Sequence, residues 1–122
     1  RVEALEPVGS PTLHAALAAG GPVDVEVGGV AADARGARRI GSIAWQVCQP
    51  HVAGAHLVAD ADILAAQQLL WRELRLAVEP AAALGLAALR AGLLRPRPDE
   101  QVALVLCGAN VDPAVLATPA AG

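Results

Sequence analysis

The stretch Gln101–Pro113, QVALVLCGANVDP, decides how the rest of the chain is interpreted. Val102–Leu106 is an unbroken run of five apolar residues, too short for an independent helix and typical of a strand buried on both faces of a parallel sheet. Small and polar residues follow at once in Cys107–Asn110. Asp112 and Pro113 are residue types that favour an N-cap and a first helical position. The stretch therefore predicts a buried strand, a tight loop and a closing helix.

The predicted loop lies where ligands often bind in this class of fold. Open parallel sheets bind ligands in the crevice at the carboxyl ends of their strands, close to helix N-termini. The small residues of Cys107–Asn110 would let a ligand approach the backbone. The alternative is a buried strand followed by an ordinary turn, and the spacing alone leaves both interpretations open.

Composition limits the class of protein. The chain has 122 residues, of which 55% are hydrophobic and only 2% aromatic, so we expect one domain with a core of Leu, Val, Ile and Ala. The net charge is −3 and there is no basic tract, so nucleic-acid binding is not expected. No apolar run is long enough for a bilayer and no leader pattern opens the chain, so membrane association is not expected. Cys48 and Cys107 are expected to be reduced thiols in a cytoplasmic protein.

Two of the residue types that the sequence lacks bear on its function and origin. All nine basic residues are arginines, so the chain holds no lysine amine for Schiff-base chemistry. It also contains no methionine and opens inside a predicted strand, so we expect a piece of a longer polypeptide.

Hydrophobic periodicity, together with Gly and Pro, predicts the remaining elements. Strands are expected at 1–5 and 53–59, with a half-exposed strand or extended edge at 23–27. Ser10 as N-cap and Pro11 as first residue would open a helix that ends at Gly20. A second helix, with an apolar stripe, is expected at 38–49 and would be closed by Pro50.

Two further helices are predicted before the Gln101 stretch. Asp60 would cap a helix that runs to about residue 76, and Ala81–Ala91 would form a buried helix ended by Gly92. The core face of the first is expected to consist of Ile63, Leu64, Leu69, Leu70 and Leu74. The resulting order, β-α-β-α-β-α-α-β-α, predicts an α/β fold: a three-layer open parallel sheet with helices on both faces. Residues 1–122 would form a single partial domain.

Several segments, in order, resemble one family. LAVEPAAALGLAAL at 76–89 is similar to a VEPAGA segment that opens a buried helix, and VALVLCGANVDP at 102–113 to a strand ending in SGGN. ALEPVGSPTLHAALAAGGPV at 4–23, VAADARGARRIG at 30–41 and HLVADADILAAQQLLWRELRLAVEP at 56–80 fit the same pattern. These segments resemble the C-terminal part of the serine/threonine dehydratases, pyridoxal-phosphate (PLP) enzymes of the tryptophan-synthase-β-like fold, also called fold type II. The resemblance places this chain in the C-terminal part of the large PLP domain.

The resemblance implies cofactor contacts. Cys107 matches the Ser or Cys that hydrogen-bonds the pyridine nitrogen of PLP; without the resemblance, an inert buried cysteine is the usual interpretation. Glu79 matches an acidic residue beside the cofactor ring, the alternative being a helix-start acid that interacts with the helix dipole. Gly108 matches the turn after the strand. Ala34 stands where the family often has a glycine whose backbone passes near the cofactor.

Other positions depart from the family pattern. Ala109 replaces a glycine, and a positive φ at this position would strain an alanine. Glu6 matches a carboxylate that holds a divalent cation in some members, but Thr12 occupies the second carboxylate position, so no metal site is expected. No ligand or triad spacing is found among His14, His51 and His56, which are expected to be surface or hydrogen-bonded core residues.

The resemblance implies a lyase for the intact protein. It would be an ammonia-lyase that converts L-serine or L-threonine into a 2-oxo acid and ammonia by α,β-elimination, with PLP as cofactor. The Schiff-base lysine and the phosphate cradle belong to the N-terminal half in this family. That half would be the partner of this chain, the intact enzyme a homo-oligomer, and the 122-residue chain alone inactive.

Two other functions stay open. One is a non-catalytic relic or a small α/β module that binds a small ligand or a partner. The other is a PLP enzyme of the same fold that performs β-replacement or isomerisation.

Overall fold

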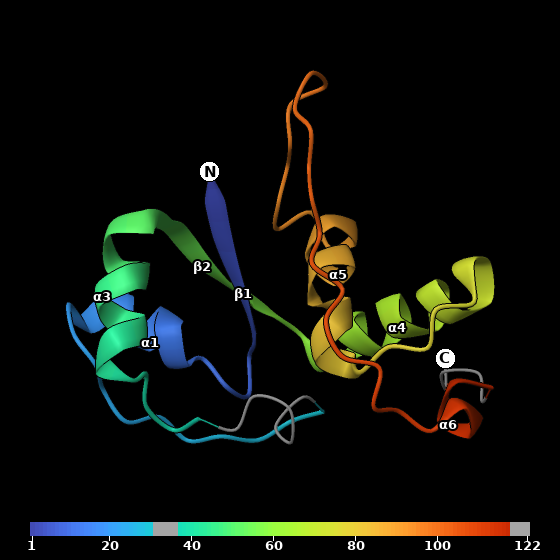
Figure 1. The fold of residues 1–122 in the computed structure, drawn as a ribbon, viewed down its shortest axis with the longest axis horizontal. Helices are drawn as coiled ribbons and strands as arrows, with labels where there is room; N and C mark the ends of the chain where they lie inside the picture. The colour runs from blue at the N-terminus through green and yellow to red at the C-terminus, as the bar shows by residue number, and fades with distance from the viewer. Residues whose placement is uncertain (31–36, 118–122) are drawn as a thin grey trace. The chain divides into compact units, whose positions relative to one another are not determined.

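The computed structural model describes residues 1–30 and 37–117. The elements in chain order are β1 (Val2–Pro7), α1 (Thr12–Ala19), α3 (Ser42–His51), β2 (Val52–Val58), α4 (Asp60–Leu74), the 3-10 helix η1 (Pro80–Ala83), α5 (Leu84–Arg90) and α6 (Pro113–Ala117) (Figure 1). They form two compact units, Arg1–Asp60 and Ala61–Gly122, and each is described by itself.

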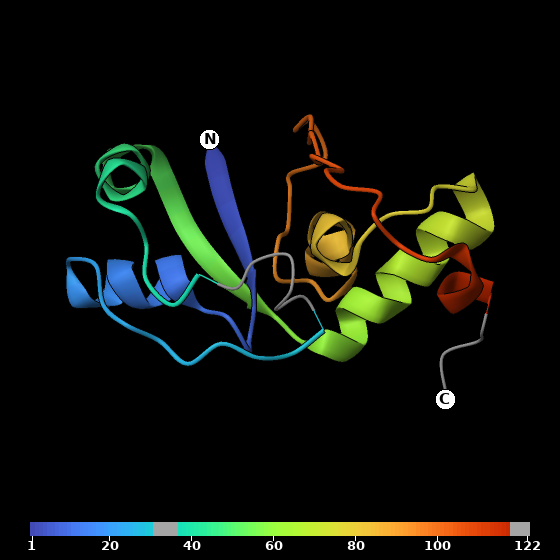
Figure 2. The same ribbon diagram turned by 60° about the horizontal axis from the view of Figure 1, so that its bottom comes forward.

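The first unit is built on a two-stranded parallel sheet. β1 and β2 pair with Leu5 opposite His56 and Pro7 opposite Val58, and α1 contacts both strands (Figure 2). Parallel strands need a crossover, which here contains α1 and α3. The expected α/β class with parallel strands is therefore confirmed. The 23–27 segment is extended and alternates between half-buried valines and exposed acids, but it is not part of a strand.

The start of α1 is held by a side chain from β1. Pro11 occupies the N-cap position and makes no side-chain cap bond, so the expectation that Ser10 caps the helix is wrong. Instead, the carboxylate of Glu6 accepts the backbone N–H groups of Leu13 and His14, at 2.8 Å each. The first amides of a helix lack partners within the helix, and this carboxylate satisfies two of them.

We predict that Glu6→Ala lowers the free energy of unfolding by about 1 kcal/mol, the usual cost of losing an N-cap acceptor. The measurement is denaturant unfolding followed by circular dichroism. The control is Glu26→Ala, since the Glu26 side chain is 96% exposed and forms only a surface ion pair with Arg38. That control should stay within about 0.5 kcal/mol of the parent. Equal stability of the two variants would contradict a capping role for Glu6.

α3 differs from the expected helix. It begins at Ser42, four residues late, and includes Pro50, which was expected to close it. Pro50 lies in the last turn, and the helix still closes around it because the N–H of Val52 bonds the carbonyl of Cys48. The apolar stripe is not covered: Ile43 is 79% and Val47 57% exposed, and no residue of α3 is buried. The periodicity predicted the helix correctly, but not its burial.

α4 supplies much of the buried surface of the second unit. Its buried residues are Ile63, Ala66, Gln67 and Leu70. Leu74, which was expected in the core, is 61% exposed. The helix ends there because Arg75 takes a left-handed φ of 56°, and the N–H of Leu76 then bonds the carbonyl of Leu70 at 3.2 Å. Leu74 therefore sits in a terminal turn with no further turn to cover it.

The expected helix Ala81–Ala91 is divided into η1 and α5. Its apolar character does correspond to burial, since Ala82, Ala83, Leu84, Ala87 and Ala88 are all buried. Gly92 ends it with φ +70°, as predicted. Just before η1, the Val78 carbonyl accepts a 2.7 Å hydrogen bond from the buried Gln67 side chain. This bond ties the segment that carries Glu79 to α4.

The expected strand at Val102–Leu106 is wrong for this chain. The segment is extended and runs beside α5, where Leu104 packs on Gly85, but it belongs to no strand (Figure 1). Val105 is 82% exposed, and no backbone–backbone hydrogen bond joins 102–107 to other described residues. A strand buried on both faces needs neighbouring strands, and the only described strands, β1 and β2, pair with each other.

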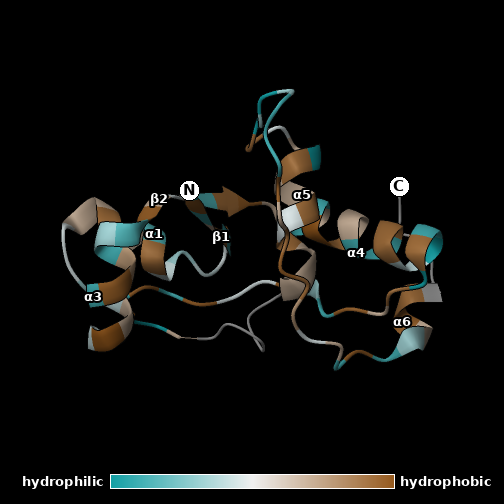
Figure 3. Cartoon of the chain, turned by 45° about the horizontal axis from the view of Figure 1, so that its top comes forward, coloured by the Kyte–Doolittle hydropathy of each residue, from teal (hydrophilic) through white to brown (hydrophobic). Residues whose placement is uncertain are grey.

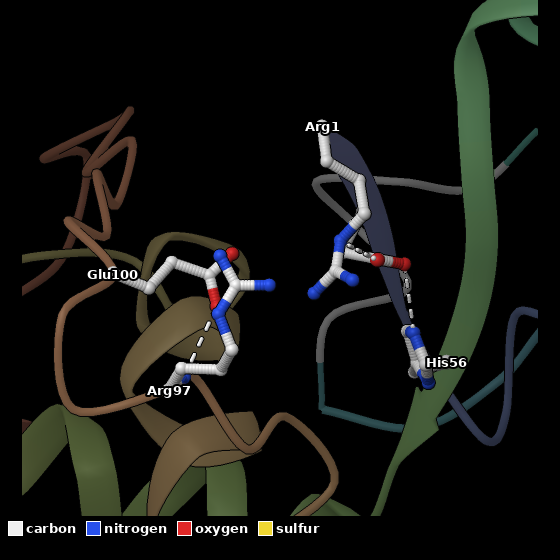
Figure 4. A network of polar contacts seen from close by, with 5 residues as sticks. Arg1, His56, Arg97 and Glu100 are labelled. Carbon is white, nitrogen blue, oxygen red and sulfur yellow. Dashed lines mark hydrogen bonds and ion pairs between the residues drawn. The ribbon is translucent and has the colours of Figure 1, made fainter.

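The three histidines are exposed or lie within hydrogen-bonding distance of protein oxygen atoms, as expected from the sequence. His14 is exposed, with Nδ1 2.8 Å from the Ala55 carbonyl oxygen. His56 lies 3.0 Å from one carboxylate oxygen of Glu3, and the other oxygen binds Arg1 at 2.8 Å (Figure 4). His51 is exposed at the end of α3.

Candidate functional site

A loop at Cys107–Asn110 is bound to Glu79, 31 residues earlier in the chain. The backbone N–H of Glu79 donates to the carbonyl of Gly108 at 3.2 Å. The carboxylate Oε1 of Glu79 in turn accepts the N–H of Asn110 at 3.4 Å. The main chain of Glu79 therefore binds Gly108, and its side chain binds Asn110 on the other side of the turn. The structure brings together three residues that the resemblance placed at the cofactor: Glu79, Cys107 and Gly108.

Gly108 allows Glu79 to approach this closely. Its φ is +83°, in the region that favours glycine. A Cβ atom at Gly108 would collide with Oε1 of Glu79 and lie 2.6 Å from its carboxyl carbon. Among the described residues Arg75 alone has a positive φ without being glycine, so the strain considered for Ala109 does not arise. Gly108 supplies the left-handed conformation by itself.

Glu79 stands at the start of η1. It occupies the N-cap position of η1 but makes no side-chain cap bond there. Its half-buried carboxylate binds the Asn110 amide instead. The Glu79 carboxylate is therefore hydrogen-bonded to this loop from a position at the start of a short helix.

The thiol of Cys107 is free and the residue is exposed. The alternative of an inert buried cysteine is therefore wrong for this chain. The reason is that the preceding Val102–Leu106 segment is uncovered, so the residue at its end is open as well. Cys48 is also free and half-buried.

The loop leads directly into α6. The Asp112 side chain accepts the N–H of Ala114 at 2.9 Å, and Pro113 is the first residue of the helix. This confirms the N-cap and first-turn proline expected from the sequence.

Ala34 lies outside the described residues, but the segment that leads toward it has an anchor that sequence reasoning missed. Asp60 is the first residue of α4 rather than its N-cap, and its Oδ2 accepts the N–H of Val30 at 3.1 Å. A Cβ at Gly29, where φ is +87°, would lie 2.8 Å from the same oxygen. The Gly28-Gly29 pair is a sequence signal for such a close approach of the backbone.

The acidic residue considered for a metal site has a different role. Glu6 binds the first amides of α1, and the Thr12 hydroxyl donates to the carbonyl of Ala37 at 2.6 Å. Within residues 1–30 and 37–117, His, Cys, Asp and Glu form no group of three or more able to hold a metal ion. In the same residues, no helix has the length and apolar character needed to cross a membrane.

Comparison with known proteins decides the family. Residues 1–108 match the family described as pyridoxal-phosphate dependent enzyme. The chain belongs to this family. It is 34% identical over 117 residues to phenylserine dehydratase of Ralstonia pickettii, covering 96% of this chain and 36% of the relative. It is 35% identical over 113 residues to the biosynthetic L-threonine dehydratase of Salmonella typhimurium, covering 92% of this chain and 22% of the relative.

Solved structures agree. Threonine deaminase of T.th. superimposes with a TM-score of 0.79 at 30% identity, covering 88% of this chain and 39% of that one. Maize serine racemase superimposes with a TM-score of 0.80 at 28% identity, and the match covers 93% of this chain and 36% of the racemase. The fold is that of the fold type II PLP enzymes. The chain therefore spans little more than a third, or less, of these relatives.

The cofactor of this family is pyridoxal phosphate. The residues present fit one wall of a site for it. Cys107 offers an exposed thiol, and the Glu79 carboxylate lies so close to Gly108 that a side chain at that position would have no room. The chain has no lysine, so the amine that holds the cofactor is not among its residues.

Proposed function

We propose that this chain forms one wall of the cofactor pocket in a PLP-dependent lyase that deaminates L-threonine or L-serine to a 2-oxo acid by α,β-elimination. The observation that carries the proposal is the exposed Cys107 thiol at the start of a loop bound by Glu79. The identities of 34% and 35% to two dehydratases support this reaction class.

Each residue of the wall has a proposed task. Cys107 contacts the pyridine nitrogen of the cofactor; as a neutral thiol it does not favour a charged pyridinium as a carboxylate would. Glu79 lies beside the ring and keeps the loop in place. Gly108 lets the Glu79 carboxylate lie against the loop, and the backbone at Ala34 lines the same pocket. When bound, PLP supplies an electron sink that stabilises negative charge at the α-carbon of the substrate.

The remaining parts of the enzyme are also proposed. The partner is the N-terminal half, which supplies the Schiff-base lysine and the phosphate cradle. Residues 1–122 then form a single partial domain, which is the C-terminal part of the large PLP domain. The intact protein is a homo-oligomer in the cytoplasm, with an amino acid as its substrate.

The first test uses the purified 122-residue chain with PLP and L-threonine or L-serine. We expect no 2-oxobutyrate or pyruvate, because no lysine amine is available. Added PLP should bind weakly, and its absorption spectrum should show no change that depends on a lysine. Formation of either 2-oxo acid by the chain alone would contradict the proposal that it supplies only one wall.

The second test asks whether a catalytic partner exists. The DNA upstream in the same reading frame should encode a lysine segment and a glycine-rich segment. A stop codon directly upstream, with no separate gene for these segments, would favour a non-catalytic relic or a small binding module.

A second candidate reaction is isomerisation. Serine racemase of Arabidopsis thaliana is 29% identical over 116 residues, and the maize racemase has the TM-score of 0.80 given above. The two candidates are separated by chiral analysis of L-serine incubated with the assembled enzyme. D-serine would indicate a racemase, and pyruvate a lyase.

A further inference from the structure

Glu79 is carried by the connection between α4 and η1, residues 75–79, which is neither helix nor strand. Figure 3 shows this connection as a coil that returns along α4 toward α5. It begins at Arg75, whose left-handed φ of 56° is unfavourable for a residue other than glycine. Secondary structure therefore does not set the position of Glu79, so other contacts must hold it.

Gln67 supplies one of these contacts. It lies among apolar side chains on the buried face of α4, and it is only 3% exposed. A buried amide side chain costs free energy unless it is hydrogen-bonded. Its Nε2 donates to the carbonyl oxygen of Val78 at 2.7 Å, and Val78 is only 6% exposed. Because both residues are buried, water cannot easily replace this bond if the amide is removed.

The carbonyl of Val78 and the N–H of Glu79 belong to the same peptide group, and this group is held from both sides. The carbonyl accepts from Gln67, and the N–H donates to the carbonyl of Gly108 at 3.2 Å. Because a peptide group is planar, fixing its carbonyl also fixes the direction of its N–H. Hydrogen bonds in such a chain strengthen one another by polarisation. One peptide group therefore connects α4 to the loop at Gly108.

We propose that Gln67 is a positioning residue of the cofactor wall. Its side-chain amide orients the peptide group before Glu79, so that the main chain of Glu79 binds Gly108 and its carboxylate binds Asn110. A buried side chain of α4 thereby keeps the loop that carries Cys107 in place. The inference rests on the proposed function for its link to the cofactor, but its first test needs no cofactor.

The experiment compares three versions of the 122-residue chain: the parent, Gln67→Met and Ile63→Val. Methionine has nearly the size and shape of glutamine but no N–H, so it removes the donor and fills the same space. Ile63 is fully buried one turn earlier in α4. Its shortening by one methyl group lowers stability without removing a hydrogen bond, so it is the matched control.

Amide hydrogen exchange is followed at Glu79 and Asn110. The reference is the Ala91 amide, which bonds the Ala87 carbonyl at the end of α5. Relative to Ala91, the Glu79 and Asn110 amides should exchange about tenfold faster in Gln67→Met than in the parent, because the peptide group is no longer held at its carbonyl. In Ile63→Val the three amides should change by the same factor. The same relative exchange in both variants would overturn the proposal.

The second readout is the dissociation constant of PLP, measured by absorption titration of the enzyme assembled with its N-terminal half. It should rise about threefold or more in Gln67→Met and stay within about twofold of the parent in Ile63→Val. A dissociation constant that is the same in Gln67→Met and in the parent would also overturn the proposal, since the cofactor wall would then not depend on Gln67.

Two outcomes separate this proposal from the proposed function. If the assembled parent binds no PLP while the Glu79 and Asn110 amides still exchange faster in Gln67→Met, the proposed function fails and the positioning of the loop by Gln67 stands. If the parent binds PLP and the two variants behave alike, the role of Gln67 fails and the proposed function stands. Should the isolated chain show no protected amides, the same exchange comparison is made in the assembled enzyme.

Discussion

Leu70→Ala is expected to lower the free energy of unfolding by about 2–5 kcal/mol, the range for removing a buried leucine side chain. Leu70 is only 4% exposed in α4. Truncation removes apolar contacts and leaves a cavity that tightly packed neighbours fill only in part. Urea unfolding of the 122-residue chain measures the change.

The matched control is Leu74→Ala, four residues later in the same helix. Leu74 is 61% exposed, so its truncation should change stability by no more than about 0.5 kcal/mol. The helix propensity change is the same for both variants, because each replaces leucine by alanine within α4. Equal losses at Leu70 and Leu74 would contradict the difference in burial between them and restore the core face expected from periodicity.

Gly108→Ala is expected to have the second-largest effect, and the largest on the candidate site. Holding a non-glycine residue near φ +83° costs on the order of 1–3 kcal/mol. The new methyl group would also occupy the place of the Glu79 carboxylate. Glu79 must move, so the Asn110 amide loses its acceptor. Faster hydrogen exchange of the Asn110 amide, together with lower stability, is the expected result.

Ala109→Gly is the control for this loop, since Ala109 has no positive φ to relieve. It should lower stability by less than about 1 kcal/mol, through the flexibility of the unfolded chain, and leave the Asn110 amide unchanged. An unchanged Asn110 amide in Gly108→Ala would show that Glu79 does not depend on the glycine. In the assembled enzyme, the same Gly108→Ala change should weaken cofactor binding if Glu79 and Cys107 form its wall.

The candidate site could be predicted from the sequence only in part. The resemblance led to Glu79, Cys107 and Gly108, and the structure places them around one turn. The bond from Glu79 to Asn110 joins residues 31 apart, and that from Asp60 to Val30 joins residues 30 apart. No local pattern specifies such contacts, because they exist only once both segments are folded.

What the sequence determined by itself is the local structure. Gly20 and Gly92 end their helices with positive φ, and Asp112 with Pro113 opens α6, because these signals act on hydrogen bonds only a few residues away. Periodicity likewise predicted that a helix exists in α3 and α4.

Only the tertiary structure decided which apolar residues are covered. The Val102–Leu106 run and the stripe of Ile43 and Val47 carry the pattern of buried residues, yet both are exposed in this chain. An apolar side chain is buried only when another part of a protein packs against it. The hydrophobic pattern of one segment does not show whether that covering part belongs to the same chain. The partner of a polar side chain is likewise set by the folded structure. The carboxylate of Glu6 caps α1 because, in the folded chain, the start of that helix lies next to the end of β1.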